Sequence, residues 1–250
     1  SPFWHLYYFS DKRIYNESDM HGLSMPDLWA VNGPKQYTDF ISSGYPEDKL
    51  IRLEALRYLD EKGISQSHEL IDRRAMVGHE GKEILIVGED NVTRMANLMA
   101  LVRQCSPIDT SHYHLTIKSH PACYVDPLKY QECALRETFE PLSECLHKFD
   151  IVISGNSTSA ALDAYMQGLQ VIIYNDGEGF NLSPLRGNAN VTFIANAKEL
   201  LTTLDLLKNS TLEEVEGEEF FFRDESLPRW RDLLGSLASR GNHDDTSRRV

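Results

Sequence analysis

Hydrophobic and polar positions alternate in blocks along the chain from 82 to 207. Short continuous apolar runs are separated by segments in which apolar residues recur every three or four positions. A continuous run fits a parallel strand buried on both faces, and the wider spacing fits a helix that covers the sheet. The pattern predicts strands at 83–88, 114–118, 150–154, 170–174 and 191–194, and helices at 91–104, 139–148, 157–167 and 197–207. Strands that alternate with helices predict an α/β fold with a doubly wound parallel sheet, a Rossmann-like domain.

The segments on both sides of this region have a different pattern. Before it, the sequence predicts a strand at 28–31, a helix at 35–43 that stops at Gly44, and a strand at 50–53. After it, an aromatic cluster at 220–222 and Trp230 predict a segment that docks on the domain, followed by a short helix. We therefore divide the chain into an N-terminal part (1–63), a linker or loop (64–81), the Rossmann-like domain (82–208), a C-terminal docking segment (209–240) and a disordered tail (241–250).

Composition and charge narrow the classes of function. The 250 residues are 41% apolar and 25% charged, as in a soluble globular protein, and no apolar run approaches the roughly 20 residues that span a bilayer. The net charge of −13 argues against a nucleic-acid partner, because phosphate backbones require clustered Lys and Arg. The four cysteines show no zinc spacing, so we expect no metal site and read them as free thiols of a cytosolic protein.

Polar residues follow four successive predicted strands of the Rossmann-like domain. After the first strand come Gly88, Glu89, Asp90 and Asn91, and after the second come Lys118, Ser119, His120 and Pro121. After the third comes the loop from Ser154 to Ser159, and after the fourth come the two groups at 175–178 and 181–184. Because the carboxyl ends of parallel strands meet at one edge of a sheet, these residues predict a ligand cleft along that edge.

Two of these groups suit an anion. The loop Ser154-Gly155-Asn156-Ser157-Thr158-Ser159 combines hydroxyls with the unpaired N–H groups of a helix start, although a simple N-cap uses the same residue types. His120 is placed to donate to an anion, and Lys118 on the same strand face adds charge. An ordinary surface or core histidine and a solvated lysine are the alternatives.

A third set of residues suits hydroxyl groups or a base edge. One acid lies before the helix that precedes the 154–159 loop, and the loop after the fourth predicted strand adds carboxylates, an amide and a hydroxyl. The alternative is that these residues only form an ordinary turn and a helix start. The members are Glu140, Asp176, Gly177, Asn181 and Ser183. The sequence has no P-loop, no G-x-G-x-x-G and no G-x-S-x-G nucleophile elbow.

Ser119-His120-Pro121 followed by the 154–159 loop resembles the His-Pro and Ser/Thr motifs of bacterial glycosyltransferases of the GT-B architecture. The enzymes concerned use CMP-activated sugars, as sialyltransferases and Kdo transferases do. The wider chain resembles surface carbohydrate biosynthesis proteins of O-antigen gene clusters through the segments 1–9, 26–33, 44–46, 54–58 and 181–187. The resemblance implies a GT-B-like fold in which 1–63 is the remnant of an incomplete N-terminal, acceptor-side domain.

The resemblance also implies roles for single residues. His120 would contact the nucleotide phosphate and stabilise its charge as the glycosidic bond breaks, which makes it the one catalytic residue we name. Ser157, Thr158 and Ser159 would bind the phosphate through hydroxyls and backbone N–H groups. Gly88, Lys118, Ser119, Pro121, Ser154 and Asn156 complete the predicted nucleotide- and phosphate-binding set. The general base is expected outside this chain.

The predicted function is therefore glycosyl transfer in bacterial surface polysaccharide or lipopolysaccharide biosynthesis. The donor substrate would be a CMP-activated acidic sugar, Kdo or a nonulosonic acid, and no further cofactor is expected. The expected partners are the nucleotide sugar and a glycan acceptor, in the cytoplasm or peripherally at the cytoplasmic face of the inner membrane. Two alternatives stay open: a non-catalytic nucleotide-sugar-binding subunit of a polysaccharide assembly complex, and an epimerase-like or glycerol-phosphotransferase-like GT-B enzyme.

Overall fold

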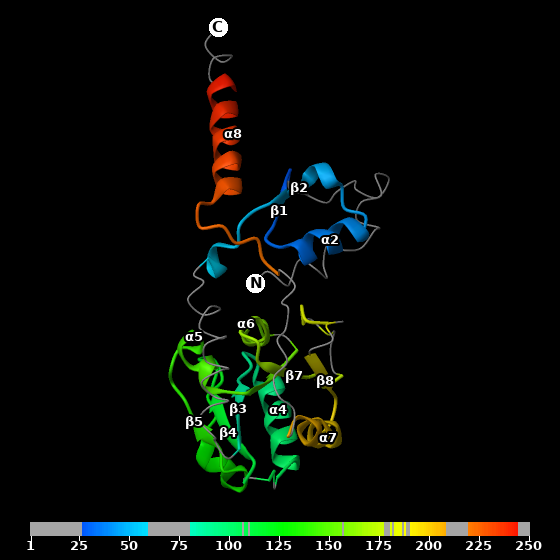
Figure 1. Ribbon diagram of the computed structural model, residues 1–250, viewed down its shortest axis with the longest axis vertical. Helices are drawn as coiled ribbons and strands as arrows, with labels where there is room; N and C mark the ends of the chain where they lie inside the picture. The colour runs from blue at the N-terminus through cyan, green and yellow to red at the C-terminus, as the bar shows by residue number, and fades with distance from the viewer. Residues whose placement is uncertain are drawn as a thin grey trace. The chain divides into compact units, whose positions relative to one another are not determined.

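The structure is a computed structural model that describes residues 27–59, 81–208 and 220–244, apart from positions 107, 110, 157, 178–180, 182, 187, 189 and 190. The chain forms two compact units (Figure 1). One comprises Lys62–Glu216, and the other is built from both ends of the chain, Pro2–Glu61 and Gly217–Val250. The predicted linker at 64–81 lies outside the described residues, except for Gly81.

The first unit contains one sheet of six parallel strands in the order β5-β4-β3-β6-β7-β8. The strands are β3 (Lys82–Val87), β4 (Tyr113–Lys118), β5 (Arg136–Glu137), β6 (Ile151–Gly155), β7 (Gln170–Tyr174) and β8 (Val191–Ile194). The predicted doubly wound sheet is confirmed, and all five predicted strands are present. The chain builds outward from β3 to β5 on one side and from β6 to β8 on the other. The topological switch point therefore lies between β3 and β6.

Four α-helices accompany this sheet: α4 (Val92–Gln104), α5 (Leu142–Cys145), α6 (Ala160–Met166) and α7 (Ala197–Leu207). Short 3-10 turns lie at η4 (Pro127–Cys133) and η5 (Leu146–Lys148). The helix predicted at 139–148 is wrong in its extent, because Pro141 has an extended backbone and only four α-helical residues follow it. The helix predicted from Ser157 begins at Ala160 and is seven residues long.

One face of the sheet forms the main described core. Alternate residues of the central strands, such as Ile84 and Ile86 on β3 and Ile151 and Ile153 on β6, are fully buried against α4 and α7. The two helices contact each other (Figure 1). The opposite face of the sheet is contacted by α6, which packs on β6 and β7. Burial on both faces explains why these strands are continuous apolar runs in the sequence.

The second unit contains a small βαβ element formed by β1 (Trp29–Val31), α2 (Pro34–Ser42) and β2 (Leu50–Arg52). The two strands pair in parallel, and Val31, Phe40, Tyr45 and Leu50 form a small core. The 3-10 turns η2 (Glu47–Lys49) and η3 (Leu56–Tyr58) flank β2. Gly44 has a φ of 88°, which fits the predicted glycine stop after α2.

The C-terminal segment completes this second unit. The N–H of Phe222 donates to the Asn32 carbonyl at 2.7 Å, and its carbonyl accepts from the N–H of Ala55 at 2.9 Å. The ring of Phe221 stacks on Tyr58 with ring centroids 4.0 Å apart. The segment predicted to dock on the Rossmann-like domain therefore contacts residues 32–58.

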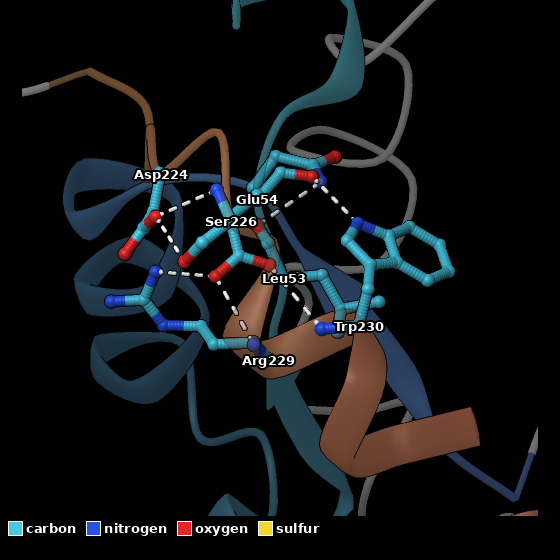
Figure 2. Close-up of polar contacts among 7 residues, drawn as sticks. Leu53, Glu54, Asp224, Ser226, Arg229 and Trp230 are labelled. Atoms are coloured by element: carbon cyan, nitrogen blue, oxygen red, sulfur yellow. Dashed lines mark hydrogen bonds and ion pairs between the residues drawn. The ribbon is translucent and has the colours of Figure 1, made fainter. Parts of the chain in front are cut away.

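A long helix, α8 (Pro228–Asp244), follows this segment (Figure 1). Its first turn binds Glu54, whose carboxylate is fully buried (Figure 2). That carboxylate accepts from the Arg229 guanidinium at 3.1 Å and from the N–H groups of Arg229 and Trp230 at 3.2 and 3.3 Å. The helix includes 241–244, so the prediction of disorder is wrong for those residues, and 245–250 lie outside the described part.

Candidate functional site

The polar groups that follow the strands of the first unit do meet at one edge of its sheet. The strands β3, β4, β6 and β7 are parallel and neighbouring, so the segments after Val87, Lys118, Gly155 and Tyr174 lie at their common carboxyl edge. In open α/β sheets this edge, next to the switch point, is where ligands bind. The candidate site is therefore the edge formed by the ends of β4, β3, β6 and β7.

Close packing joins the ends of β3 and β4. The N–H of Gly88 donates to the Lys118 carbonyl at 2.9 Å. A Cβ atom at position 88 would lie 2.6 Å from the backbone nitrogen of His120, which leaves no room for a side chain there. Gly88 therefore acts in the site by letting the His120 segment approach β3.

The backbone around His120 forms a tight turn. The His120 carbonyl accepts from the N–H of Cys123 at 2.9 Å, and the Cys123 thiol donates to the Asp90 carbonyl at 3.2 Å. The Nδ1 atom of His120 accepts from the N–H of Ala122 at 3.1 Å. Because Nδ1 accepts, the neutral imidazole carries its proton on Nε2, which is thereby a donor for a ligand. The ring is partly exposed.

The two residues before His120 have protein partners. The Ser119 hydroxyl accepts from the N–H of Val125 at 3.2 Å and donates to the Glu137 carboxylate at 3.5 Å. The Lys118 ammonium donates to the backbone carbonyl of Glu140 at 2.5 Å. Pro121, the residue after His120, is exposed.

The structure places Glu140 in an ion pair. Its carboxylate accepts from the Lys148 ammonium at 2.6 Å, and both side chains are about half exposed. With Lys148 on its carboxylate and Lys118 on its carbonyl, Glu140 holds the loop before α5 against the end of β4. This arrangement gives Glu140 a structural role, while its predicted contact with a sugar hydroxyl stays a prediction.

The loop after β6 is only partly a binding surface. Ser154 is fully buried within the strand, and its hydroxyl donates to the Gly155 carbonyl at 3.1 Å, so we correct its predicted contact with phosphate. The buried Asn156 amide donates to the Asn175 side chain at 2.9 Å, which ties β6 to β7. Thr158 and Ser159 are partly exposed. Ser157 lies outside the described residues.

The short helix α6 changes the argument for an anion at this loop. The Thr158 hydroxyl accepts from the N–H of Ala160 at 3.2 Å, while Ser159 at the N-cap makes no side-chain cap bond. A helix of seven residues carries a weaker dipole than the longer helix predicted from the sequence. Hydroxyls and local N–H groups, more than the helix dipole, are thus what this loop offers to an anion.

The segment after β7 contributes turns as well as polar groups. The Asp176 carboxylate accepts from the Asn97 amide of α4 at 3.1 Å. Gly177 has a φ of 75° and open space around it. The Asn181 side chain accepts from the N–H of Ser183 at 3.1 Å, and the buried Ser183 hydroxyl accepts from the N–H of Leu185 at 3.2 Å. Asn181 and Ser183 therefore make a local turn, the alternative that the sequence left open.

One residue of this edge has a position that the sequence does not predict. Glu89, directly after the end of β3, is only 1% exposed. Its carboxylate lies against Gly155 at the end of β6, since a Cβ atom at position 155 would be 2.0 Å from Glu89 Oε1. A carboxylate thus occupies the switch point between β3 and β6. Its place after a strand was evident from the sequence, but its burial was not.

Other reactive groupings among the described residues lie elsewhere or are incomplete. No group of three or more potential metal ligands occurs in the described part of the chain. A Ser-His-Asp group at Asp109, Ser111 and His112 stands before β4, at the opposite end of the sheet from the site. Both Ser111 and Asp109 contact the same ring nitrogen of His112, which is not the geometry of a catalytic triad. None of the described helices is long and apolar enough to cross a membrane.

Comparisons with known proteins support the fold. The sequence matches no protein-family model and no curated protein. Among solved structures, UDP-GlcNAc 2-epimerase from Methanocaldococcus jannaschii, in complex with UDP-GlcNAc and UDP, is similar with a TM-score of 0.56 and 12% identity. The alignment covers 84% of this chain and 61% of the epimerase, so this chain spans less than two thirds of that protein.

Two further solved structures resemble the chain more weakly. The wall teichoic acid polymerase TagF has a TM-score of 0.41 with 15% identity, over 75% of this chain and 49% of its own. HepE from Anabaena, in complex with UDP and glucose, has a TM-score of 0.42 with 12% identity, over 75% of this chain and 55% of its own. The parallel six-stranded sheet and the likeness to the epimerase together confirm an α/β fold of the GT-B type.

Proposed function

We propose that the carboxyl edge of the six-stranded sheet binds the phosphate of a sugar nucleotide, and that the chain is the donor-binding part of a glycosyltransferase. The observation that carries the proposal is the geometry of His120. Its Nδ1 atom accepts a backbone hydrogen bond, so its Nε2 atom carries the proton of the neutral ring at the strand edge. The motif resemblance of Ser119-His120-Pro121 points to the same residue.

The chemistry asked of His120 is stabilisation of a leaving group. When a glycosidic bond to a nucleotide breaks, the phosphate oxygen that leaves gains negative charge, and a donor already aimed at that oxygen lowers the barrier. The close approach enforced by Gly88 and the 2.9 Å bond from Cys123 to the His120 carbonyl fix the turn in advance. The Thr158 and Ser159 hydroxyls, in the loop between β6 and α6, would bind the opposite side of the phosphate.

The donor we propose is a CMP-linked acidic sugar, Kdo or a nonulosonic acid, and the acceptor a bacterial surface glycan in the cytoplasm or at the cytoplasmic face of the membrane. The two-motif resemblance supports CMP. The epimerase of similar fold was solved with UDP-GlcNAc and UDP, which makes a uridine nucleotide the main competing ligand. Because the chain spans only part of that relative, we place the general base outside the described site and propose that transfer needs further residues.

Calorimetric titration of CMP, CDP and UDP into the 250-residue protein and into His120→Ala tests the proposal. We expect CMP to bind, and the variant to lose roughly tenfold to a hundredfold in affinity, the usual loss of a hydrogen bond to a charged group. His114→Ala is the matched control, because that imidazole lies on β4, the strand that leads to His120, and pairs with Glu83. Failure of all three nucleotides to bind, or equal CMP affinity in His120→Ala, would contradict the proposal.

A further inference from the structure

We propose that Glu137 is a positioning residue, which holds the turn that carries His120 so that the Nε2–H of the imidazole faces the phosphate. This inference rests on the proposed function, because it concerns the same site. Glu137 is the last residue of β5, the edge strand next to β4, and neither the motif resemblance nor the proposed function uses it.

The carboxylate of Glu137 bonds to both sides of the turn. The Tyr124 hydroxyl, four residues after His120, donates to Glu137 Oε2 at 3.2 Å. The Ser119 hydroxyl, directly before His120, donates to Glu137 Oε1 at the longer distance of 3.5 Å. A carboxylate has two oxygens that accept hydrogen bonds, so one side chain can hold two hydroxyl donors at once. Glu137 thus joins both ends of the segment 119–124 to β5.

The segment between the two hydroxyls is itself closed by hydrogen bonds. His120 and Cys123 form an isolated antiparallel bridge, and the Ser119 hydroxyl accepts from the N–H of Val125 at 3.2 Å. Cys123 and Val125 are buried, which anchors the end of the turn in the core. The Nδ1 atom of His120 accepts from the N–H of Ala122 within the same turn. The orientation of the ring therefore depends on the shape of the turn.

The turn is held between two strands. On the β3 side, the absence of a side chain at Gly88 permits the close approach of the His120 backbone. On the other side, Ile117 of β4 pairs with Glu137, and the Ile117 carbonyl accepts from the N–H of Thr138 at 3.0 Å. Contact with β3 sets one limit to the position of the turn, and the bonds to Glu137 set the other.

Glu137 acts through His120 and not on the ligand. In the sheet, β5 is two strands away from β3, so Glu137 is about 10 Å from the end of β3. A phosphate bound between His120 on one side and Thr158 on the other stands near the end of β3, beyond hydrogen-bond reach of β5. A carboxylate also has no proton to donate to a phosphate oxygen.

Calorimetric titration of CMP into the 250-residue protein and its variants measures the effect on binding. We expect Glu137→Ala to bind CMP about fivefold more weakly, because a turn that keeps the competent shape about one-fifth of the time lowers the apparent affinity by that factor. Tyr124→Phe removes the shorter bond and keeps the ring, so it should lose about threefold for the same reason. Glu137→Gln keeps the length of the side chain and one acceptor oxygen, and should stay within about twofold of the wild type.

A double-mutant cycle with His120 separates positioning from a general effect on the fold. Glu137→Ala should change the CMP affinity of the His120→Ala protein by less than about 1.5-fold, since the group that it positions is absent there. Glu132→Ala is the matched control. It removes the same charge from the same stretch of chain, but its carboxylate bonds to Arg103 near the end of α4, at the amino edge of the sheet. Its CMP affinity should equal that of the wild type.

A measurement without nucleotide tests the positioning itself. The nitrogen NMR resonance of His120 Nδ1 depends on whether this atom accepts a hydrogen bond, and it is assigned by its absence in His120→Ala. At a pH at which the imidazole is neutral, the wild type and Glu132→Ala should share one resonance position. In Glu137→Ala the resonance should move towards that of a histidine whose Nδ1 atom accepts no bond.

The outcomes separate this inference from the proposed function. If CMP fails to bind the wild type, the proposed function fails, and the Nδ1 resonance alone decides whether Glu137 positions the ring. If CMP binds, the role of Glu137 is overturned by an unchanged affinity or an unchanged Nδ1 resonance in Glu137→Ala, or by an equal loss in the His120→Ala protein, and nucleotide binding stands. Should Glu137→Ala not fold, Tyr124→Phe and its cycle with His120→Ala decide.

Discussion

The two units of the chain are built by different means. In the unit Lys62–Glu216 each strand is followed by elements that are near in sequence, and the central residues are buried under α4 and α7. In the other unit a single βαβ element has a described core of only four residues, and segments about 170 residues apart in sequence meet. There, buried polar contacts do much of what burial of apolar side chains does in the larger unit.

The comparison teaches where each unit is vulnerable. A core spread over many aliphatic side chains loses only part of its stability with any one residue. A small core that depends on one buried carboxylate is more sensitive, because removal of that carboxylate leaves several donors without an acceptor. The chain offers separate probes for the two units: its three tryptophans, at 4, 29 and 230, fall in the second unit, and its four cysteines fall in the first.

The largest expected effect is that of Glu54→Ala. The substitution removes the acceptor of the Arg229 guanidinium and of two N–H groups in the first turn of α8. We expect the free energy of unfolding of the second unit to fall by about 3 kcal/mol, the cost of breaking a buried charged pair. Urea unfolding followed by tryptophan fluorescence measures it, while the cysteine reactivity transition should not move.

Glu47→Gln is the control for this prediction. The Glu47 carboxylate belongs to the same unit and accepts from the Tyr37 hydroxyl at 2.5 Å, but it is exposed. Its replacement should change stability by less than about 0.5 kcal/mol, as is usual for surface positions. Equal effects of the two substitutions would mean that the buried carboxylate does not hold the chain ends together.

Gly33→Ala tests the contact between the same two ends of the chain, here through the backbone. A Cβ atom at position 33 would lie 1.6 Å from the carbonyl oxygen of Phe220, a backbone atom that cannot move without breaking the pairing of that segment. Overpacking of this kind costs about 2 kcal/mol. The tryptophan transition reports the loss, and Gly235→Ala on α8, where nothing lies within 4 Å, should leave stability equal or slightly higher.

The fold could be predicted well where burial alone determines the pattern. The apolar runs placed β7 and β8 at their observed limits and the other central strands to within a few residues. The pattern missed β5, because Arg136 and Glu137 form a two-residue edge strand without an apolar run. The tail helix was placed too short, since its residues 234–239 are exposed and its start is fixed by the distant Glu54.

The candidate site could be predicted only in outline. The common edge of the sheet followed from the parallel topology, and the position of His120 on that edge followed with it. The partners of single side chains could not be predicted. Lys118 contacts Glu140 and Ser119 contacts Glu137, and both partners belong to the segment around β5, whose path the sequence does not reveal. The burial of Glu89 depends on Gly155, 66 residues later, and no local pattern contains that relation.

A smaller effect is expected at Asp109, an exposed counterpart to Glu54 in the larger unit. Hydrogen bonds from Ser111, with a further bond from Lys208, lower the pKa of Asp109 from its ordinary value of 3.8 to about 2. A carboxyl whose folded pKa is lowered stabilises the protein above its unfolded pKa and loses that contribution as the pH falls through the folded value. Asp109→Asn should therefore be slightly less stable than the wild type at pH 7, and equally stable near pH 2.

Thermal unfolding of the two proteins, followed by far-ultraviolet circular dichroism from pH 7 down to pH 2, measures this difference. The carboxylate is about half exposed, so its contribution should be much smaller than that of Glu54. An Asp109→Asn protein that differs from the wild type by the same amount at both ends of the range would contradict the assigned pKa.

The smallest effect concerns the thiols that serve as the probe of the larger unit. Burial, with the nearby Cys133, raises the pKa of Cys105 to about 11, so at pH 8 only about one molecule in a thousand carries the thiolate that reacts. In the folded protein Cys105 should thus react with a thiol reagent far more slowly than free cysteine, and at the free rate once the unit unfolds. The control is Cys105→Ser: the slow phase that disappears in this variant is the reaction of Cys105. If that phase moved to lower urea in Glu54→Ala, the two units would unfold together. The contrast between the apolar core of the larger unit and the buried polar contacts that hold the smaller unit would then be lost.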